Sequence, residues 1–357
     1  ITQTQPSLGG TSSIAASSHS EQSLKSDSGG ARSGQGGIEN AIESGTGAYA
    51  GAEATTPGGT ASHGPGSSSD GGRGDLAGAG TAGASAAAAG AGCAGPFEHI
   101  ATTKNFGPLC VAKQVRLPEE YSIDATEVSV GQYRAWLALN PQYADANAQP
   151  LVACRSWHKY FAPPAECASH PSVFTGQDSD HHPVVCVDWC DAYAYCHAVG
   201  KRMCGATRGG SLTFGQPSTG ASSGWSVSQW LNACSSGGIT TQIPTSFPWC
   251  YPYGREFDRK ACNGRELELG TTRAVGSSST CQSPYQDYSG IYDLSGNVAE
   301  WEDSCWGYSG DQQAQDICRT RGGAFDGDES SLGCGFNGEA FRMDTSPGIG
   351  FRCCSVD

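Results

Sequence analysis

The chain has 357 residues, 37% of them apolar, and a formal net charge of −14 at neutral pH. No apolar run reaches the roughly 20 residues that a bilayer-spanning helix needs. Because the charge is acidic and no cluster of lysine or arginine offsets it, nucleic acids and anionic membranes are not expected as partners, whereas cations stay open as ligands.

The first 92 residues differ in composition from the rest. They hold 22 of the 51 glycines, a single aromatic residue (Tyr49) and no cysteine. Such a segment cannot bury enough apolar surface to offset the entropy of ordering it. We therefore predict a disordered Gly/Ser/Ala-rich tether over residues 1–92 and one domain over residues 93–357.

All 17 cysteines lie in the predicted domain. Cysteine at this density indicates an oxidising compartment, so we expect a protein that is secreted or tethered at the cell surface, as in a bacterial envelope. The alternative, a zinc-rich cytosolic protein, normally carries C-x-x-C pairs, and the sequence has none.

The first predicted helix begins after a capping box. Ser129 and Gln132 have the spacing in which each side chain caps the backbone of the other. Tyr133, Trp136 and Leu137 then form an apolar stripe at helical spacing, which predicts that this helix packs against the core.

Two more helices are predicted further along the chain. One covers residues 189–199, with Asp188 as its N-cap and Gly200 at its end, and it turns Cys196 toward the core. The other begins at the Ser226-x-x-Gln229 pattern and places Cys234 on its apolar face. Brief extended pieces are expected at Val184–Val187 and Gly350–Cys354, and no βαβ alternation is visible.

Five segments, in order, form a specific combination of motifs. They are Ile123–Val128; His182–Val185 with Val187–Trp189 and Ala194–Cys196; Gly200–Arg202; Gly290–Trp301, which reads G-x-Y-D-x-x-G-N-V-x-E-W; and Arg321–Gly323 with Gly350–Cys353. Over about residues 110–357 the chain resembles the formylglycine-generating enzyme (sulfatase-modifying factor) family. The resemblance implies an α+β, irregular, loop-rich, disulfide-stapled fold, a variant of the C-type-lectin-like fold.

The resemblance also implies a chemistry. Enzymes of the family bind copper(I) through two cysteine thiolates in the loop after R-G-G-S, and convert a cysteine of a sulfatase peptide to formylglycine; soft thiolates suit this soft cation. Here Ala324 replaces the serine, and Gly327 stands where the first thiolate belongs. Cys334 has the spacing to Cys353 of the family's structural cysteine. We therefore expect neither copper nor a catalytic residue.

Two disulfides are carried over from the family. Cys196 is expected to pair with Cys353, and Cys234 with Cys334. The other pairings are left open because the number of combinations is large. Cys93 lies at the junction with the tether and is expected to be the odd cysteine.

Two calcium sites are suggested by the same resemblance. Asp293, Gly296, Val298 and Glu300 match one set of family ligands, and two carboxylates with two main-chain carbonyls suit a hard cation. The alternative is a tight turn in which Asn297 bonds its own backbone and Glu300 is solvated. The second set begins with the Asn263 side chain and the Gly264 carbonyl, and Glu266 or Glu268 would complete it.

An acidic run replaces the copper loop. Asp326, Asp328 and Glu329 could form a new cation site or a cup for a polar ligand, but a solvated loop is the favoured interpretation.

The sequence thus favours a catalytically degenerate, exported member of the family that serves as a binding or structural module for an extracellular peptide, protein or glycan. One alternative is an active oxidase whose metal has unexpected ligands, and another is a partner that only positions a substrate peptide for an enzyme. The presence of two free thiols in the folded domain would favour the oxidase.

Overall fold

The structure is a computed structural model. The predicted tether over residues 1–92 lies outside the residues that the structure describes. Among the described helices, none has the length and apolar character of a membrane span. The described residues are 93, 95–103, 107–157, 159–214, 227–238, 251–307 and 310–356.

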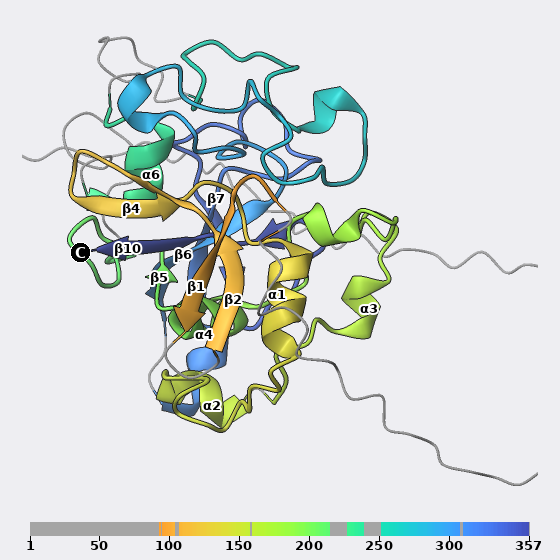
Figure 1. Ribbon diagram of the computed structural model, residues 1–357, viewed down its shortest axis with the longest axis vertical. Helices are drawn as coiled ribbons and strands as arrows, with labels where there is room; N and C mark the ends of the chain where they lie inside the picture. The colour runs from red at the N-terminus through yellow and green to blue at the C-terminus, as the bar shows by residue number, and fades with distance from the viewer. Residues whose placement is uncertain are drawn as a thin grey trace, which may run out of the picture. The chain divides into compact units, whose positions relative to one another are not determined.

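The domain is α+β, with short elements separated by long loops (Figure 1). The helices are α1 (Val130–Leu137), α2 (Val152–Trp157), α3 (Ala165–Ala168), α4 (Trp189–Ala198) and α6 (Gln229–Cys234), with 3-10 turns η1 (Ser179–His181), η3 (Arg265–Leu267), η4 (Gln286–Tyr288) and η5 (Gly310–Gln315). The strands are β1 (Glu98–Thr103), β2 (Gly107–Ala112), β3 (Gln114–Arg116), β4 (Tyr121–Asp124), β5 (Arg202–Met203), β6 (Ala299–Trp306), β7 (Ile317–Arg321), β8 (Gly338–Phe341), β9 (Ile349–Gly350) and β10 (Cys353–Val356).

The strands form three small sheets. A hairpin pairs β1 with β2, a second sheet has the order β3-β4-β10-β5, and a third has the order β8-β7-β6-β9. The last strand, β10, lies antiparallel between β4 and β5, so the C-terminal residues join the beginning of the domain to its middle (Figure 1).

Local sequence signals fix the first two long helices. Ser129 and Gln132 form the predicted capping box of α1, and Asp188 caps α4 by accepting a hydrogen bond from the Asp191 N–H. Gly200, with φ of +76°, follows the end of α4 as predicted.

Two predictions of elements were wrong in detail. The helix α6 begins at Gln229 and is capped by the Ser228 side chain, whereas Ser226 lies outside the described residues. The extended piece expected over residues 184–187 is interrupted at Cys186, whose φ is +62°. The main chain there bonds to single residues of other segments: the Val184 N–H donates to the Val128 carbonyl, and the Cys186 N–H donates to the Ser346 carbonyl.

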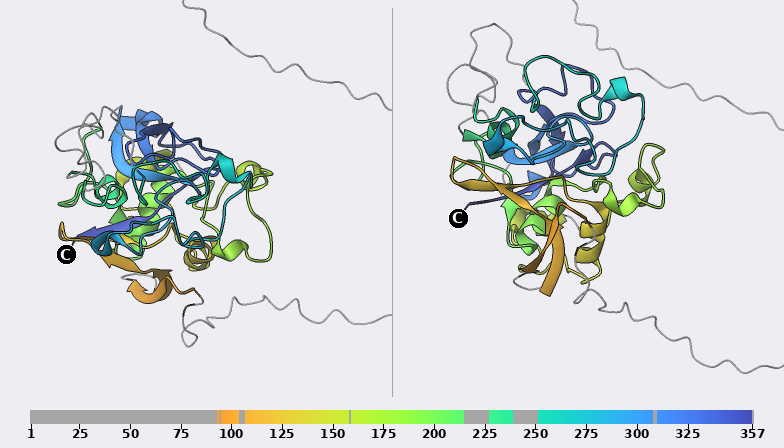
Figure 2. Two further views of the ribbon diagram at one scale, coloured as in Figure 1. Left: turned by 90° about the horizontal axis from the view of Figure 1, so that it is seen from above. Right: turned by 45° about the horizontal axis from the view of Figure 1, so that its top comes forward.

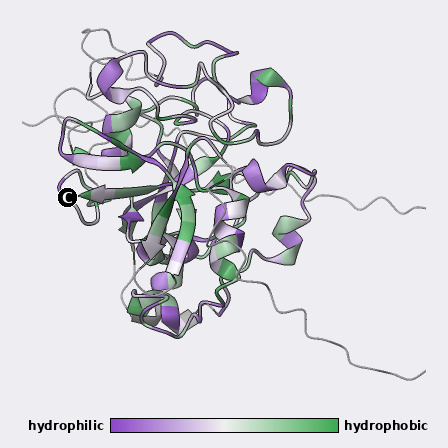
Figure 3. Ribbon diagram, in the orientation of Figure 1, coloured by the Kyte–Doolittle hydropathy of each residue, from purple (hydrophilic) through white to green (hydrophobic). Residues whose placement is uncertain are grey.

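The core is largest where α1 meets α4. Tyr133 and Trp136 of α1 pack against Tyr195 of α4 with ring centroids 5.6 Å apart in both pairs, and Phe351 closes the cluster. Figure 2 shows these helices and the β1–β2 hairpin on one side of the domain and the irregular chain between residues 251 and 298 on the other. Hydrophobic and hydrophilic residues alternate within both helices and strands (Figure 3), as expected for elements with one buried face.

Among the described residues, eight disulfides hold the loops together. Two of them are the expected pairs, and five connect cysteines whose partners the sequence left open. The eighth joins Cys93 to Cys110, so the expectation that Cys93 is the odd cysteine was wrong. The remaining cysteine, Cys250, lies outside the described residues. The full set is Cys93–Cys110, Cys154–Cys190, Cys167–Cys186, Cys196–Cys353, Cys204–Cys354, Cys234–Cys334, Cys262–Cys281 and Cys305–Cys318.

Candidate functional site

The segment Gly290–Trp301 makes a tight turn before it enters β6. Asp293, Gly296 and Asn297 all have left-handed backbone conformations, with φ of +60°, +74° and +61°. At Gly296 no other residue fits, because a Cβ would lie 2.2 Å from the main-chain oxygen of Asn263. The turn is therefore packed directly against the segment that holds the second predicted calcium set.

Glu300 follows this turn and is committed to a buried ion pair. Its carboxylate accepts two hydrogen bonds of 2.7 Å from the Arg352 guanidinium and one of 2.9 Å from the Trp230 indole. Glu300 and Arg352 are both almost completely buried. The alternative interpretation, in which Glu300 is solvated, is thus wrong. The Arg352 guanidinium already balances the negative charge that Glu300 could offer to a calcium ion.

Asp293 lies beside a carboxyl group that the sequence analysis did not select. It accepts a hydrogen bond of 2.6 Å from the Gly276 N–H, and burial raises its pKa to about 6. Burial, and then the nearby Asp293 charge, raise the pKa of Glu127 well above its ordinary value. Two buried carboxyl groups side by side resist double ionisation, so the pair favours a retained proton or a bound cation. Glu127 lies within the matched segment Ile123–Val128, so the motif match was a sequence signal that could have identified this residue.

Asn297 connects the two calcium sets instead of bonding its own backbone. Its amide donates to Glu127, and its oxygen accepts hydrogen bonds from the Asn263 amide and the Arg273 N–H. The corresponding part of the alternative interpretation is also wrong. Val298 is buried, and its side chain lies in a small apolar cluster with Val185 and Cys186.

The second calcium set has oxygen atoms without partners. The Asn263 side-chain oxygen and one Glu266 carboxylate oxygen are buried and accept no hydrogen bond among the described residues. Glu266 folds back so that this oxygen lies 3.5 Å from the Cβ position of Gly264, whereas Glu268 is exposed. Of the two acidic residues left open by the sequence, Glu266 is therefore the one whose side chain lies against Gly264. Carboxylate, amide and carbonyl oxygens are ligands that suit a hard cation.

The loop after Gly323 is closed around its own main chain. A Cβ placed on Gly327 would lie 2.7 Å from the Ser331 hydroxyl oxygen and 3.0 Å from the Ala324 carbonyl oxygen. The Arg265 N–H donates to the Gly327 carbonyl at 2.9 Å. A side chain at position 327 would therefore require the loop to move.

The acidic residues of this loop have local partners. One Asp328 oxygen accepts hydrogen bonds from the Ser330 hydroxyl and from the Ser330 and Ser331 N–H groups, and these bonds lower the pKa of the Asp328 carboxyl. Asp326 and Glu329 are exposed. Hydrogen bonds that a carboxylate accepts from residues two and three positions further along the chain are typical of a solvated turn.

The structure brings together both cysteine pairs carried over from the family. Cys196 bonds to Cys353 and Cys234 bonds to Cys334, and all four are fully or almost fully buried. Every described cysteine is in a disulfide, so the described residues do not supply the two thiolates of the family's copper site. Within them, only Cys93, Glu98 and Cys110 bring three metal-binding side chains within 4.8 Å, and these two cysteines are bonded to each other.

Comparisons with solved structures give low similarity. The chain is 21% identical to CarF, with 66% of this chain and 86% of that chain covered and a TM-score of 0.41. It is 19% identical to PvdO from Pseudomonas aeruginosa, with 73% and 91% covered and a TM-score of 0.41. It is 16% identical to Treponema denticola variable protein 1, with 72% and 91% covered and a TM-score of 0.38.

No curated protein sequence matches the chain. The family model of the sulfatase-modifying factor enzyme 1-like domain, in contrast, matches residues 90–356. This span includes every matched motif, the buried Glu300–Arg352 pair and all eight disulfides. The chain therefore belongs to the sulfatase-modifying factor enzyme family.

Proposed function

We propose that this protein is an exported, catalytically degenerate member of its family that acts as a surface binding or structural module. The observation that carries the proposal is the state of the cysteines. Sixteen are paired in disulfides, so at most one thiol per chain is left, whereas a copper(I) site of the family type needs two. The density of disulfides supports an oxidising, extracytoplasmic location.

Oxygen consumption tests this proposal. The full chain, loaded with copper under mildly reducing conditions, is expected to consume no oxygen with a cysteine-containing sulfatase peptide, and the peptide's mass is expected to stay unchanged. Gly327→Cys is expected to remain silent as well, because its side chain clashes with Ser331 and Ala324. Copper-dependent formylglycine in the peptide would establish the oxidase function instead.

We also propose that calcium supports the fold at Asn263, Gly264 and Glu266. The support is the pair of buried oxygen atoms without hydrogen-bond donors. The set Asp293, Gly296, Val298 and Glu300 is less suited as it stands, because the Arg352 guanidinium already neutralises Glu300. Arg352 would also repel a divalent ion placed beside it.

Calcium titration with two neighbouring variants separates these sets. Binding to the native state alone stabilises by about 2.7 kcal/mol at a hundredfold excess over the dissociation constant. Glu266→Gln is expected to abolish this gain, while Glu268→Gln, which alters an exposed carboxylate two residues away, is expected to retain it. If Asp293→Asn abolished the gain and Glu266→Gln did not, the first set would be the site. A melting temperature indifferent to calcium and to chelator in the parent chain would exclude both.

A further inference from the structure

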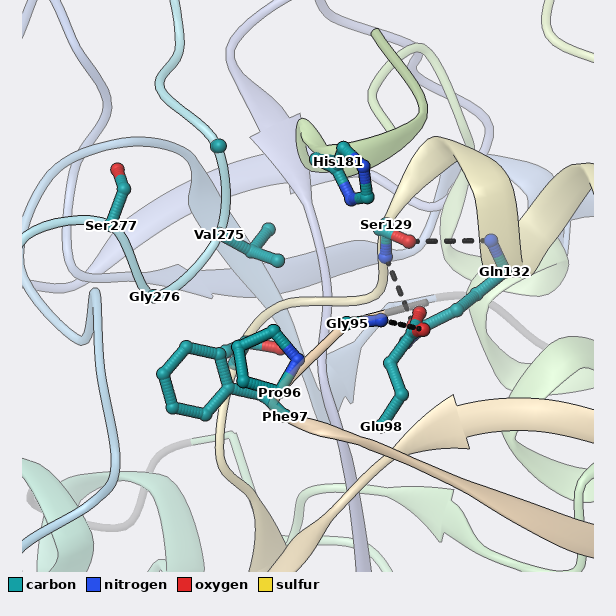
Figure 4. A pocket seen from close by; sticks show the side chains of 12 residues that line it. Gly95, Pro96, Phe97, Glu98, Ser129, Gln132, His181, Val275, Gly276 and Ser277 are labelled. Carbon is teal, nitrogen blue, oxygen red and sulfur yellow. Dashed lines mark hydrogen bonds between the residues drawn. The ribbon is translucent and has the colours of Figure 1, made fainter. Parts of the chain in front are cut away.

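A pocket of about 290 Å³ lies away from the loop that corresponds to the copper site. Four separate segments enclose it: residues 95–98, the beginning of α1, the end of η1, and residues 274–277. Figure 4 shows the His181 ring on one side of this space and the Glu98 carboxylate on another, with Phe97 and Val275 at its walls. The volume is near the lower end of the range for small-ligand sites.

Close contacts hold the walls in place. The Val275 N–H donates to the His181 carbonyl at 2.8 Å, which ties η1 to the fourth segment. Gly276 approaches the Phe97 ring so closely that a Cβ there would lie 2.4 Å from it. On the other side, Gly131 allows α1 to approach the main chain of Asp180, next to His181. A pocket with fixed walls loses little entropy when it is filled.

The segment that carries Glu98 is clamped independently. The Cys93–Cys110 disulfide anchors its beginning, and both sulfur atoms lie within 4.8 Å of a Glu98 carboxylate oxygen. Lys113 donates from its N–H to the Phe97 carbonyl at 2.7 Å and from its ammonium group to the Pro96 carbonyl at 2.9 Å. The carboxylate is therefore presented by a rigid segment.

The Glu98 carboxylate forms no ion pair with a residue that lines the pocket. One Glu98 oxygen accepts a hydrogen bond from the Gln132 amide at 2.9 Å, and the other accepts one from the Gly95 N–H at 3.0 Å. A carboxylate has about four acceptor positions, so two stay available. No lysine or arginine lines the pocket. The Phe97 ring adds an aromatic surface, which attracts organic cations.

We propose that this pocket binds an organic cation, an ammonium or guanidinium group on a short apolar stem, as presented by a lysine or arginine side chain of a peptide. Glu98 receives the charged group, and Phe97 and Val275 contact the stem. The inference rests on the proposed function of a binding module, and it names the chemistry of the ligand. The acidic character of the whole chain favours the approach of such a ligand.

Binding of small probes to the full chain tests the proposal. Titration calorimetry with N-acetyl-lysine N-methylamide is expected to give saturable binding, and the norleucine analogue, which has a comparable apolar stem without the charge, is expected to bind at least about tenfold more weakly. The arginine analogue distinguishes a preference for guanidinium from one for ammonium. Equal binding of the lysine and norleucine probes, or no binding of either cationic probe at millimolar concentration, would overturn the proposal.

Three variants locate the site. Glu98→Gln is expected to weaken the lysine probe by at least about tenfold, and Val275→Phe, which fills the pocket, is expected to abolish binding without changing Glu98. Glu166→Gln, which removes an exposed carboxylate on α3, is the matched control and is expected to bind normally. Melting temperatures are recorded for all three, so that loss of binding is scored only in folded protein. Unchanged binding in folded Val275→Phe would contradict the proposal.

Failure of this test is distinguishable from failure of the proposed function. The oxygen-consumption measurement reports on the loop at Gly327 and does not involve any residue of the pocket. A silent oxidase assay with no probe binding would remove the ligand assignment alone, whereas an active oxidase assay would remove the proposed function whatever the pocket binds.

Discussion

The chain from Ile291 to Arg321 and the loop from Ala324 to Ser331 adjoin each other in sequence, yet they differ in burial and in bonding. In the first region Glu302 pairs with Arg321 and Glu300 pairs with Arg352, with all four side chains at most 1% exposed. In the loop, Asp328 is 47% exposed, and among the described residues its one ion pair, to Arg265, spans 3.9 Å.

The buried ion pairs of the first region support the fold, whereas the loop from Ala324 to Ser331 corresponds to the family's copper loop. The first region keeps the family motif because buried charges without partners are costly, so each residue constrains the others. The loop departs from the family pattern and is closed by its own serine hydroxyls, at little cost to the core. A family fold can therefore persist while one loop on it varies in sequence.

Removing a long-range disulfide of the core is expected to have the largest effect. Cys196→Ala/Cys353→Ala opens a bridge of sequence separation 157, for which chain entropy corresponds to roughly 4–5 kcal/mol. The matched control, Cys305→Ala/Cys318→Ala, opens a separation of 13 and is expected to cost about 3 kcal/mol. Denaturant unfolding measures both, and a control variant less stable than the core variant would contradict this order.

The buried ion pair should be the next most sensitive feature. Glu300→Ala leaves Arg352 buried without its partner and is expected to lower the free energy of unfolding by about 3–5 kcal/mol. Asp328→Ala removes a carboxylate from the exposed loop and is expected to cost less than about 1 kcal/mol. Similar losses for the two variants, measured by urea unfolding, would remove the contrast between the two regions.

A smaller effect is expected from His182, which begins the matched segment His182–Val185. Its ring stacks on Phe174 at 3.7 Å and bonds to the Thr272 hydroxyl, and burial lowers its pKa to about 4. The unfolded chain takes up the proton first, at about pH 6.5, so the contribution is complete above that pH and is lost as the pH falls toward 4.

The His182→Gln variant isolates this contribution. Between pH 7 and pH 5 the parent is expected to lose about 2 kcal/mol more stability than the variant, because the variant has no imidazole to protonate. Unfolding curves at the two pH values measure the difference, and the other buried carboxyl groups cancel in the comparison. Equal losses in both proteins would show that His182 does not contribute.

Local features of the fold were predictable, and features that depend on distant contacts were not. The caps Ser129 and Asp188 act on residues three positions away, so the sequence alone reveals them. The pairing of Glu127 with Asp293 joins distant segments and leaves no periodic signal. The same holds for the Cys204–Cys354 disulfide, because the register of β10 beside β5 brings these two cysteines together.

The candidate sites divide in the same way. The motif match selected Glu300, but it could not reveal that Arg352 neutralises this carboxylate. The resemblance also named Asn263 and Gly264, and it left open that Glu266 folds back on Gly264. The departure of the loop from the family's copper pattern can be read from the sequence, because it rests on the identity of single residues such as Gly327.

The number of free thiols tests the central claim most directly. Alkylation of the unreduced, denatured full chain, followed by mass spectrometry, is expected to label at most one of the 17 cysteines, and to recover Cys234 linked to Cys334. Such a chain cannot assemble a two-thiolate copper site. Two or more labelled cysteines, with Cys234 or Cys334 among them, would contradict the claim and restore the oxidase as the better interpretation.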